Sequence, residues 1–243
     1  MSFKAGIITQ ARIGSTRLPG KVLKKINSSS LLDYHIRGLK KSGLPVVVAT
    51  SDLEVDKAIV DFCEHIGVDY FRGSESDVLS RFYHTALKYK FDIVIRVTSD
   101  CPLVDGALIK SGLEQSGILQ KKNLYVSNAL KRTYPRGYDF EIFSFDMLKD
   151  AYENAKEPHE REHVTPYIYK KAVANNRNFD VLAKEDFSSF RLTVDTQEDF
   201  NLIEILIRDF HADSLSLEGV LEVLGRNPGL KEINADIVQK PLI

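Results

Sequence analysis

The chain has 243 residues, of which 43% are hydrophobic and 28% charged, and its formal net charge is -1. This balance argues against a dedicated nucleic-acid-binding protein, which is usually basic, and no apolar run approaches the ~18 residues that a membrane span needs. Cys63 and Cys101 are too few for a disulfide framework or a zinc cluster. With no secretory signal pattern at the start, we expect a cytoplasmic protein with reduced thiols and no nucleic-acid or membrane partner.

Apolar runs alternate with amphipathic segments over the first half of the chain. The runs predict strands at residues 3–9, 44–52, 68–71 and 92–97. The amphipathic spacing predicts helices at residues 31–41, 56–66, 77–89 and 105–117. This order, with near-continuous apolar strands, predicts an α/β fold whose mostly parallel sheet is covered by helices on both faces.

The pattern changes after about residue 122. Short strands are predicted at residues 125–127, 138–144, 179–182 and 190–194. Helices are predicted near residues 146–156, 160–173, 197–209 and 217–225. The last stretch, 227–243, is weakly patterned and is expected to be an extended tail. No internal repeat or linker divides the chain, so a single domain over residues 1–243 is expected.

A loop rich in glycine and basic residues, QARIGSTRLPGK (10–21), follows the first predicted strand. It is not a Walker A loop, because five residues rather than four separate Gly14 from Gly20, and Val22 stands where Ser or Thr is required. It also lacks the GxGxxG of a dinucleotide fold. Its basic side chains are those of Arg12, Arg17 and Lys21. Such a loop outside a strand's carboxyl end predicts phosphate binding, and a solvated basic loop is the alternative.

Two aspartates follow predicted strands. Asp100 lies in TSDCP after the strand at 92–97, and Asp195 lies in VDTQED before the helix at 197–209. The alternative for Asp100 alone is a turn. The alternative for Asp195 alone is a helix cap, because Thr196 and Asp199 have capping-box spacing. Taken together beside a phosphate loop, two carboxylates match the oxygen ligands that magnesium uses with substrate phosphates. We therefore expect Asp100 and Asp195 to hold Mg2+.

Seven segments carry a family resemblance over about residues 3–210. They are ARIGSTRLPGK, VVVATS, FRGSESDVLSRFY, VIRVTSDCPLVD, YVSN, EREHVTPYI and RLTVDTQEDF, in this order. The set resembles the spore-coat polysaccharide biosynthesis cytidylyltransferases, which are related to the CMP-ulosonate (3-deoxy-manno-octulosonate and acylneuraminate) cytidylyltransferases. The resemblance implies a three-layer Rossmann-like nucleotide-diphospho-sugar transferase fold with a small antiparallel insert. It also implies CTP-dependent transfer of a cytidylyl group to a sugar, with a sugar acid expected, and release of pyrophosphate.

The same resemblance assigns the nucleotide site and divides the domain. The implied nucleotide-binding residues are Gln10, Ala11, Arg12, Gly14, Ser15, Thr16, Arg17, Lys21, Thr50, Ser51, Arg81 and Ser99. Arg12 and Lys21 are the implied catalytic residues. A surface arginine paired with Asp77 is the alternative for Arg81. The nucleotide half is expected at about 1–122, the acceptor and dimer half at 123–210, and a C-terminal helix and tail at 211–243. A homodimer through the helices after residue 146 is expected by analogy.

The acceptor site is expected in the second half of the chain. Its candidate residues are Arg136, Tyr138, Asp139, Glu141, Arg161 and His163. Either arginine is suited to a sugar-acid carboxylate, because a guanidinium donates two hydrogen bonds to that group. A hairpin with an exposed polar face is the alternative, since Asp139 and Glu141 alternate with apolar residues.

One rival motif is HEREH at residues 159–163, a literal zinc-protease HExxH. Pro158 and Pro166 allow only a short helix around it, and no third ligand motif follows, so we do not expect a zinc hydrolase. Two further readings stay open from the sequence. One is a nucleotide-sugar-dependent glycosyltransferase, against which the lysine in the loop argues, and the other is a non-catalytic nucleotide-binding protein.

Overall fold

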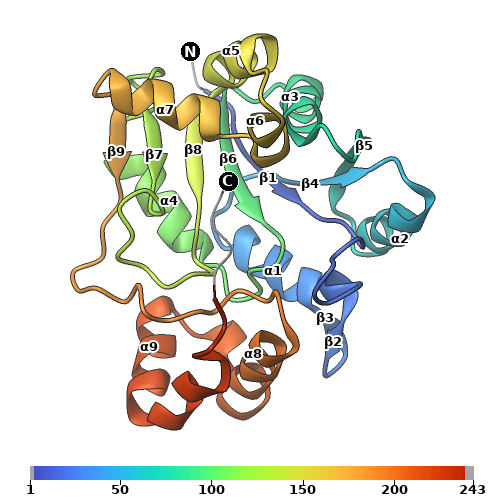
Figure 1. Ribbon diagram of the computed structural model, residues 1–243, viewed down its shortest axis with the longest axis vertical. Helices are drawn as coiled ribbons and strands as arrows, with labels where there is room; N and C mark the ends of the chain where they lie inside the picture. Colours follow the sequence, from blue (N-terminus) through green and yellow to red (C-terminus); the bar gives the residue numbers. More distant parts are fainter. Residues whose placement is uncertain (1–2, 239–243) are drawn as a thin grey trace.

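The computed structural model, which describes residues 3–238, is built on a central sheet with strand order β5-β4-β1-β6-β8-β7-β9 (Figure 1). Its strands are β1 (Ala5–Gln10), β4 (Val46–Ser51), β5 (Asp69–Gly73), β6 (Ile93–Thr98), β7 (Tyr125–Ser127), β8 (Glu141–Ser144) and β9 (Asn178–Asp180). β1, β4, β5 and β6 run parallel, and β8 runs antiparallel to both β6 and β7. The predicted fold class, a mostly parallel sheet with a small antiparallel part, is confirmed.

Helices cover both faces of this sheet and make three layers. They are α1 (Leu31–Lys40), α2 (Lys57–His65), α3 (Val78–Tyr89), α4 (Gly106–Gln115), α5 (Phe145–Asn154), α6 (Pro158–His163), α7 (Pro166–Ala174), α8 (Gln197–Phe210) and α9 (Leu217–Arg226). Successive strand residues point to opposite faces. Ile7 thus packs with α1, α4, α8 and α9, whereas Ile8 packs with α3, α5 and α7. Between residues 3 and 238 no helix is long and apolar enough to span a membrane.

The predicted helix 160–173 is wrong as one element. It divides into α6 and α7, because Pro166 begins the second helix and Val164 adopts a φ of 71°. Such a φ is rare for a β-branched residue. The Thr165 amide donates to the His163 carbonyl at 2.8 Å across Val164, which closes a γ-turn. The break turns the chain back toward the sheet, so that Thr165 contacts Glu141.

Two other predictions fail near the C-terminus. The segment predicted as a strand at 190–194 forms only an isolated bridge between Arg136 and Arg191, although Leu192 and Val194 are buried. The stretch predicted as an extended tail forms a 3-10 helix, η4 (Pro228–Asn234), that packs on α8 and α9. Residues 239–243 of that prediction lie outside the described residues.

The sheet's topology selects one edge as the place for a ligand. The chain passes from β1 to β4 and β5 on one side, then returns to β6 on the other side of β1. Such a reversal opens a crevice outside the carboxyl ends of the two strands. The loop after β1 and the turn after β6 both lie there, and Figure 1 shows α8 and α9 beyond the arrowhead of β6. A two-stranded sheet of β2 (Lys25–Ile26) and β3 (Ser29–Ser30) flanks this edge.

Two glycines let α1 and α4 approach closely beneath this crevice. A Cβ atom on Gly106 would lie 2.6 Å from the Gly38 carbonyl oxygen, and one on Gly38 would lie 2.4 Å from the Val104 carbonyl oxygen. Both obstacles are backbone atoms, so a side chain here requires the helix to move. Gly225 in α9 has no such neighbour within 4 Å.

We predict that Gly106→Ala lowers the free energy of unfolding by about 1–3 kcal/mol, because overpacking against backbone forces α4 outward. Gly225→Ala is the control and should be neutral or stabilising by up to about 1 kcal/mol, since alanine favours a helix. Urea unfolding followed by circular dichroism measures both. Equal stability changes in the two variants would contradict the close α1–α4 contact.

Candidate active site

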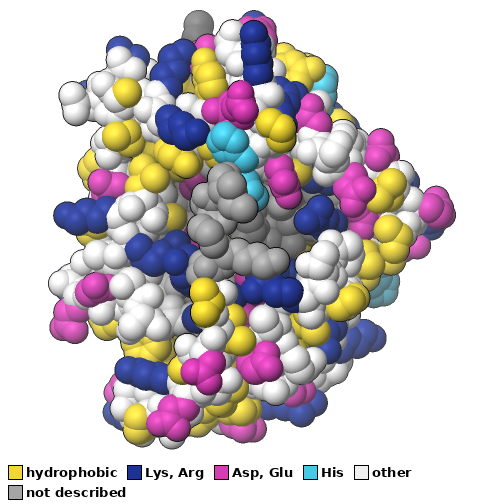
Figure 2. Space-filling view, viewed as in Figure 1, with side chains coloured by type: hydrophobic (Ala, Val, Ile, Leu, Met, Phe, Trp, Pro, Cys, Tyr) yellow, Lys and Arg dark blue, Asp and Glu magenta, His cyan; other side chains and the backbone are white. Residues whose placement is uncertain are grey.

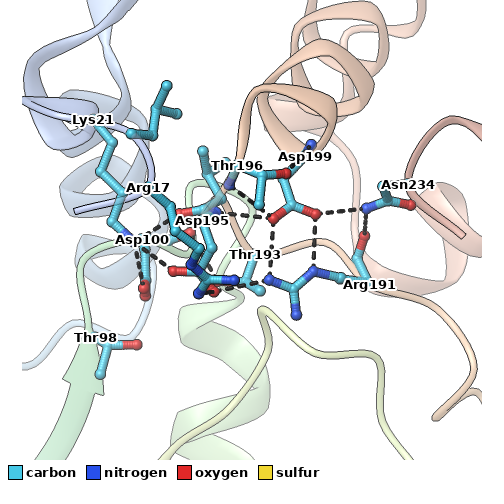
Figure 3. A network of polar contacts seen from close by, with 12 residues as sticks. Arg17, Lys21, Thr98, Asp100, Arg191, Thr193, Asp195, Thr196, Asp199 and Asn234 are labelled. Carbon is cyan, nitrogen blue, oxygen red and sulfur yellow. Dashed lines mark hydrogen bonds and ion pairs between the residues drawn. The ribbon is translucent and has the colours of Figure 1, made fainter. Parts of the chain in front are cut away.

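The Lys21 ammonium group lies at the centre of the crevice. Its Nζ donates to Asp100 Oδ2 at 2.9 Å, to Asp195 Oδ1 at 2.7 Å and to the Val194 carbonyl at 2.7 Å (Figure 3). All three ammonium donors therefore have an oxygen acceptor. The sequence prediction that the loop and the two aspartates meet in space is confirmed by these contacts.

The loop after β1 delivers Lys21 through its own backbone. The Ile13 carbonyl accepts from the Ser15 amide at 2.7 Å and from the Gly20 amide at 3.1 Å, which closes the loop on itself. Leu18 is buried and anchors it. Gly20 takes a φ of 66°, a conformation that glycine adopts without strain, and the 3-10 helix η1 (Lys21–Leu23) begins directly after it. The chain therefore turns sharply just before Lys21.

Asp195 forms ion pairs with two more cations. Its Oδ2 forms an ion pair with Arg17 Nη2 at 3.0 Å and accepts a hydrogen bond from Arg191 Nη2 at 2.8 Å. Arg191 also donates through Nε to Asp199 Oδ1 at 2.8 Å. Arg191 was not predicted as a site residue. Its only signal was a basic residue four positions before Asp195, in a segment that was predicted to be an ordinary strand.

Asp199 is fully buried and fixes the strand-to-helix turn that holds Asp195. Its Oδ2 accepts from the backbone amides of Asp195 at 2.9 Å and Thr196 at 3.2 Å, and with Thr196 it forms the capping box of α8. Asn234 of η4 donates to Asp199 Oδ1 at 2.9 Å and to the Arg191 carbonyl at 3.0 Å. The capping role predicted for Thr196 and Asp199 is confirmed, and a C-terminal residue that sequence analysis overlooked completes the network.

The opposite charges of Asp100 and Lys21 favour the ionised form of both groups. Burial disfavours the Asp100 carboxylate, but the Lys21 charge and hydrogen bonds from Thr98, Lys21 and Cys101 outweigh it and lower the Asp100 pKa to about 2. Burial likewise opposes the Lys21 charge, yet Asp100 and Asp195 raise the Lys21 pKa above its ordinary value. The site is therefore a set of paired ions at neutral pH.

His35 of α1 supports the Asp100 turn from below. It is fully buried, and its Nδ1 lies 2.8 Å from the Cys101 carbonyl while its Nε2 lies 2.8 Å from Thr9 Oγ1. A carbonyl only accepts, so Nδ1 carries the proton and Nε2 accepts from the Thr9 hydroxyl. Burial lowers the His35 pKa to about 4, although the Cys101 hydrogen bond and the Asp100 charge oppose the change. The neutral ring therefore links β1 to the turn after β6.

Buried polar atoms without a partner gather at the carboxyl ends of β1 and β4. Among the described residues, Gln10 Oε1, Thr50 Oγ1 and the Nε and Nη1 atoms of Arg81 have no hydrogen-bond partner. Arg81 reaches this place from α3 and is only 2% exposed. The surface ion pair weighed for Arg81 is wrong, because Asp77 instead caps α3 and pairs with Arg161. Unpaired buried donors are costly, so these atoms favour a polar ligand.

The remaining predicted nucleotide residues lie around the same loop. Ser99 donates from its hydroxyl to the Gln10 carbonyl at 2.6 Å. Ser51 donates to Asp56, which also accepts from the Ile13 amide at 2.7 Å. These two hydroxyls therefore hold the loop and the strand ends in place. Ala11 is buried and Ser15 is half-buried, whereas the exposed members of the set are Arg12, Gly14, Thr16 and Arg17. Figure 2, viewed as Figure 1, shows Lys and Arg side chains around the middle of the face turned to the viewer.

A family model described as cytidylyltransferase matches residues 6–237. The chain belongs to the cytidylyltransferase family. It is 35% identical over 231 residues to the spore coat polysaccharide biosynthesis protein SpsF of Bacillus subtilis, which covers 91% of this chain and 94% of that protein. A solved structure of a cytidylyltransferase from Leptospira borgpetersenii matches with a TM-score of 0.90 and 32% identity, over 98% of this chain and all of that one. The predicted family is thus confirmed, and the enzyme class is nucleotidyltransferase.

Similarity to the sugar-acid branch is more limited. The 3-deoxy-manno-octulosonate cytidylyltransferase of Aeromonas salmonicida is 33% identical over 110 residues, which is 43% of this chain and 42% of that protein. Family membership favours nucleotidyl transfer over the glycosyltransferase and the non-catalytic protein weighed from the sequence.

The acceptor candidates of this cytidylyltransferase fall into two groups. Arg132 forms an ion pair with Asp139, whose pKa is raised by burial despite the arginine charge. The Arg136 side chain is half-buried and makes no ion pair or hydrogen bond with any part of the chain from 3 to 238, while Tyr138 is buried in the core. Arg136 therefore keeps donors for a ligand, whereas Tyr138 supports the segment from inside.

The second group joins elements around β8. Glu141 accepts from Arg96, from the Tyr125 hydroxyl and, at 2.7 Å, from Thr165 Oγ1. Arg161 donates to Asp77 and, at 2.8 Å, to the Tyr152 carbonyl. His163 is half-buried at the end of α6. Glu141 and Arg161 thus already have protein partners.

The HEREH segment also has protein contacts of its own. The Lys170 ammonium lies 3.2 Å from His159 Nε2 and 3.8 Å from Glu160 Oε1. Within the described part of the chain, no group of three or more His, Cys, Asp and Glu residues is arranged to hold a metal ion. The segment lies within α6, which packs on α3 and α7.

We predict that His35 makes the protein less stable as the pH falls from 6.5 to 4. The unfolded chain takes up a proton at its ordinary pKa of 6.5 while the folded chain resists until about 4, so unfolding gains protons and folded stability decreases by about 3 kcal/mol. Urea unfolding at a series of pH values measures the slope. His35→Gln should flatten it, and the exposed His65→Gln should not. An unchanged slope in His35→Gln would contradict a neutral buried ring.

Proposed function

We propose that this chain transfers the cytidylyl group of CTP to a hydroxyl of a sugar acid and releases pyrophosphate. One observation carries the proposal: Lys21 of a glycine-rich loop is bound between Asp100 and Asp195 at the carboxyl edge of the sheet. Membership of the cytidylyltransferase family supports the transferred group. Similarity to a polysaccharide biosynthesis protein and to a 3-deoxy-manno-octulosonate cytidylyltransferase supports a sugar-acid acceptor and a place in surface-polysaccharide or glycan synthesis.

The loop after β1 is proposed to bind the triphosphate. Arg12 and Arg17 are exposed on it and Lys21 lies at its end, so the loop carries three cations. Exposed backbone at Gly14 and the hydroxyls of Ser15 and Thr16 add neutral donors to phosphate oxygens. Arg12 and Lys21 are the proposed catalytic residues, because charge on the α-phosphate and on the leaving pyrophosphate increases in the transition state.

The cytosine and ribose are proposed to lie against Gln10, Ala11, Thr50 and Arg81. Gln10 Oε1 is a buried acceptor and the Arg81 Nε and Nη1 atoms are buried donors. Cytosine offers an amino donor beside ring acceptors, so the unpaired atoms complement its edge. Ser51 and Ser99 contribute indirectly by fixing the strand ends that carry these groups.

The two aspartates fit a magnesium ion. Asp100 follows β6 and Asp195 precedes α8, and the two carboxylates already enclose a cation. The remaining ligands that Mg2+ prefers come from water and substrate phosphates. Asp100 and Asp195 would hold the ion. When bound, it would neutralise charge on the phosphates and help acidify the attacking hydroxyl. A divalent cation is thus the proposed cofactor.

The proposed reaction needs no protein nucleophile. The sugar hydroxyl oxygen forms a bond to the α-phosphorus, the bond from that phosphorus to the bridging oxygen breaks, and the hydroxyl proton passes to water. The protein aligns the hydroxyl oxygen, the α-phosphorus and the bridging oxygen, and its cations neutralise the phosphate charge. Arg191 and Asp199 keep Asp195 at its place during this step.

Arg136 is proposed to hold the acceptor's carboxylate, with Asp139 beside it. Arg136 has free donors within the described residues, whereas Arg161 is paired with Asp77 and Glu141 with Arg96. Tyr138, Glu141, Arg161 and His163 are therefore proposed to shape the acceptor side.

The division into a nucleotide half and an acceptor half stays a prediction. So does the homodimer, for which α5, α6 and α7 offer Val173 as their large exposed apolar side chain among the described residues.

We predict that Asp100→Asn and Lys21→Met each lower pyrophosphate release from CTP and a sugar acid by at least about 100-fold, because each removes charge stabilisation at the reacting phosphate. An enzyme-coupled pyrophosphate assay measures the rate. Lys24→Met is the control, since Lys24 contacts Gln197 rather than the aspartates. Turnover near the wild-type rate in either site variant, with its fold intact by circular dichroism, would exclude this site.

Replacing each acceptor arginine separates the two candidates. Arg136→Gln should raise the KM for the sugar acid by about 10-fold or more with a smaller effect on kcat, because a charged hydrogen bond to the carboxylate is lost. Arg161→Gln should instead lower the thermal stability, because it leaves Asp77 unpaired at the start of α3. Steady-state kinetics and thermal unfolding distinguish the outcomes. The reverse pattern would assign the carboxylate to Arg161.

A further inference from the structure

The Lys21 ammonium is held as a bound cation would be. Three oxygens surround it at 2.7–2.9 Å, one from each aspartate and one from the Val194 carbonyl. The side chains involved are only 12–23% exposed. Carboxylate and carbonyl oxygens are also the ligands of hard cations. The lysine of the phosphate loop therefore uses the oxygen atoms that are proposed for the metal.

A second loop cation closes the other side of the site. Arg17 binds Asp195 Oδ2, and Lys21 binds Asp195 Oδ1, so both oxygens of this carboxylate face the loop's cations. Among the described residues, the ion pairs around Asp195 join three carboxylates to three cations. The carboxylates are Asp100, Asp195 and Asp199, and the cations are Arg17, Lys21 and Arg191. The formal charges of these six side chains balance.

We infer that Lys21 and Arg17 occupy the two-aspartate site when no nucleotide is bound, so that the protein takes up the divalent cation together with the triphosphate and not as a free ion. This inference rests on the proposed function of the site. It specifies the substrate as the metal–CTP complex.

Charge explains the preference for the complex. A free divalent ion must displace Lys21 from both carboxylates, which leaves the lysine partly buried without its counterions and adds positive charge to a balanced network. A metal–triphosphate complex is anionic and brings phosphate oxygens with it. Lys21 and Arg17 then exchange carboxylate partners for phosphate partners, and no charge is left unpaired.

The two sides of the site differ in how firmly they are held. Asp195 is fixed by Arg191 and by the fully buried Asp199, which also binds its backbone amide. Arg17, in contrast, lies on an exposed turn with 30% of its side chain accessible. Asp195 is therefore firmly held, and Arg17 is the more accessible of the two loop cations that bind it.

Binding of Mn2+ to the nucleotide-free protein tests the inference, with electron paramagnetic resonance reporting free Mn2+. Wild type should bind Mn2+ weakly, and Lys21→Met should bind it about 10-fold or more tightly, because two close carboxylates lose their lysine. Arg17→Met should also bind Mn2+ more tightly than wild type, but by a smaller factor than Lys21→Met. Because Arg17 is exposed, this second variant should fold even if Lys21→Met does not. Lys24→Met is the matched control and should behave as wild type. Added CTP should increase Mn2+ binding by the wild type beyond the binding by the same CTP concentration without protein.

The outcomes separate this inference from the proposed function. Equal Mn2+ affinities of wild type, Lys21→Met and Arg17→Met, with pyrophosphate release by the wild type intact, would overturn the exchange and leave the function standing. Mn2+ binding by none of the proteins, with or without CTP, would overturn the exchange and the two-aspartate metal site together.

Discussion

Three stretches of the chain that are far apart in sequence meet at one ammonium group. Lys21 comes from the loop after β1, Asp100 from the turn after β6, and Asp195 from the segment before α8. A lysine with two carboxylates and a carbonyl is stable in a partly buried place only because each charge has a partner. Removing one member leaves the others uncompensated. The position of the loop, the turn and the start of α8 therefore depends on this contact.

The surrounding structure keeps the acidic half of this contact rigid. His35 links β1 to the Asp100 turn from inside the fold, and Asp199 holds the Asp195 turn through backbone amides. Asn234 extends the support to the C-terminal helical turn, so a segment remote from the sheet takes part in the site. Buried networks of this kind stabilise a single geometry when every member is satisfied. The rigid carboxylates and the looser cationic loop together suit a site that must exchange one cation for another.

Much of the fold and the heart of the site could be predicted from the sequence. Apolar runs located the long parallel strands, because a strand buried on both faces leaves a continuous signal. The loop and Asp100 could be placed together because carboxyl ends of parallel strands share one edge. Asp195 joins them although the strand predicted before it does not form. Arg191, His35 and Asn234 could not, since their partners lie at positions that only tertiary packing reveals. The segment expected to be a strand at 190–194 is buried but forms no ladder with another strand. The turn at Val164 depends on a strained φ that no local preference suggests.

The most direct test of the account is a crystal structure with Mg2+ and a non-hydrolysable CTP analogue. We predict that the triphosphate lies against the loop at residues 12–21, that the metal is bound by Asp100 and Asp195, and that the Lys21 ammonium has moved from those carboxylates onto phosphate oxygens. A nucleotide bound elsewhere, or Lys21 still between the two aspartates with the metal and triphosphate in place, would contradict it.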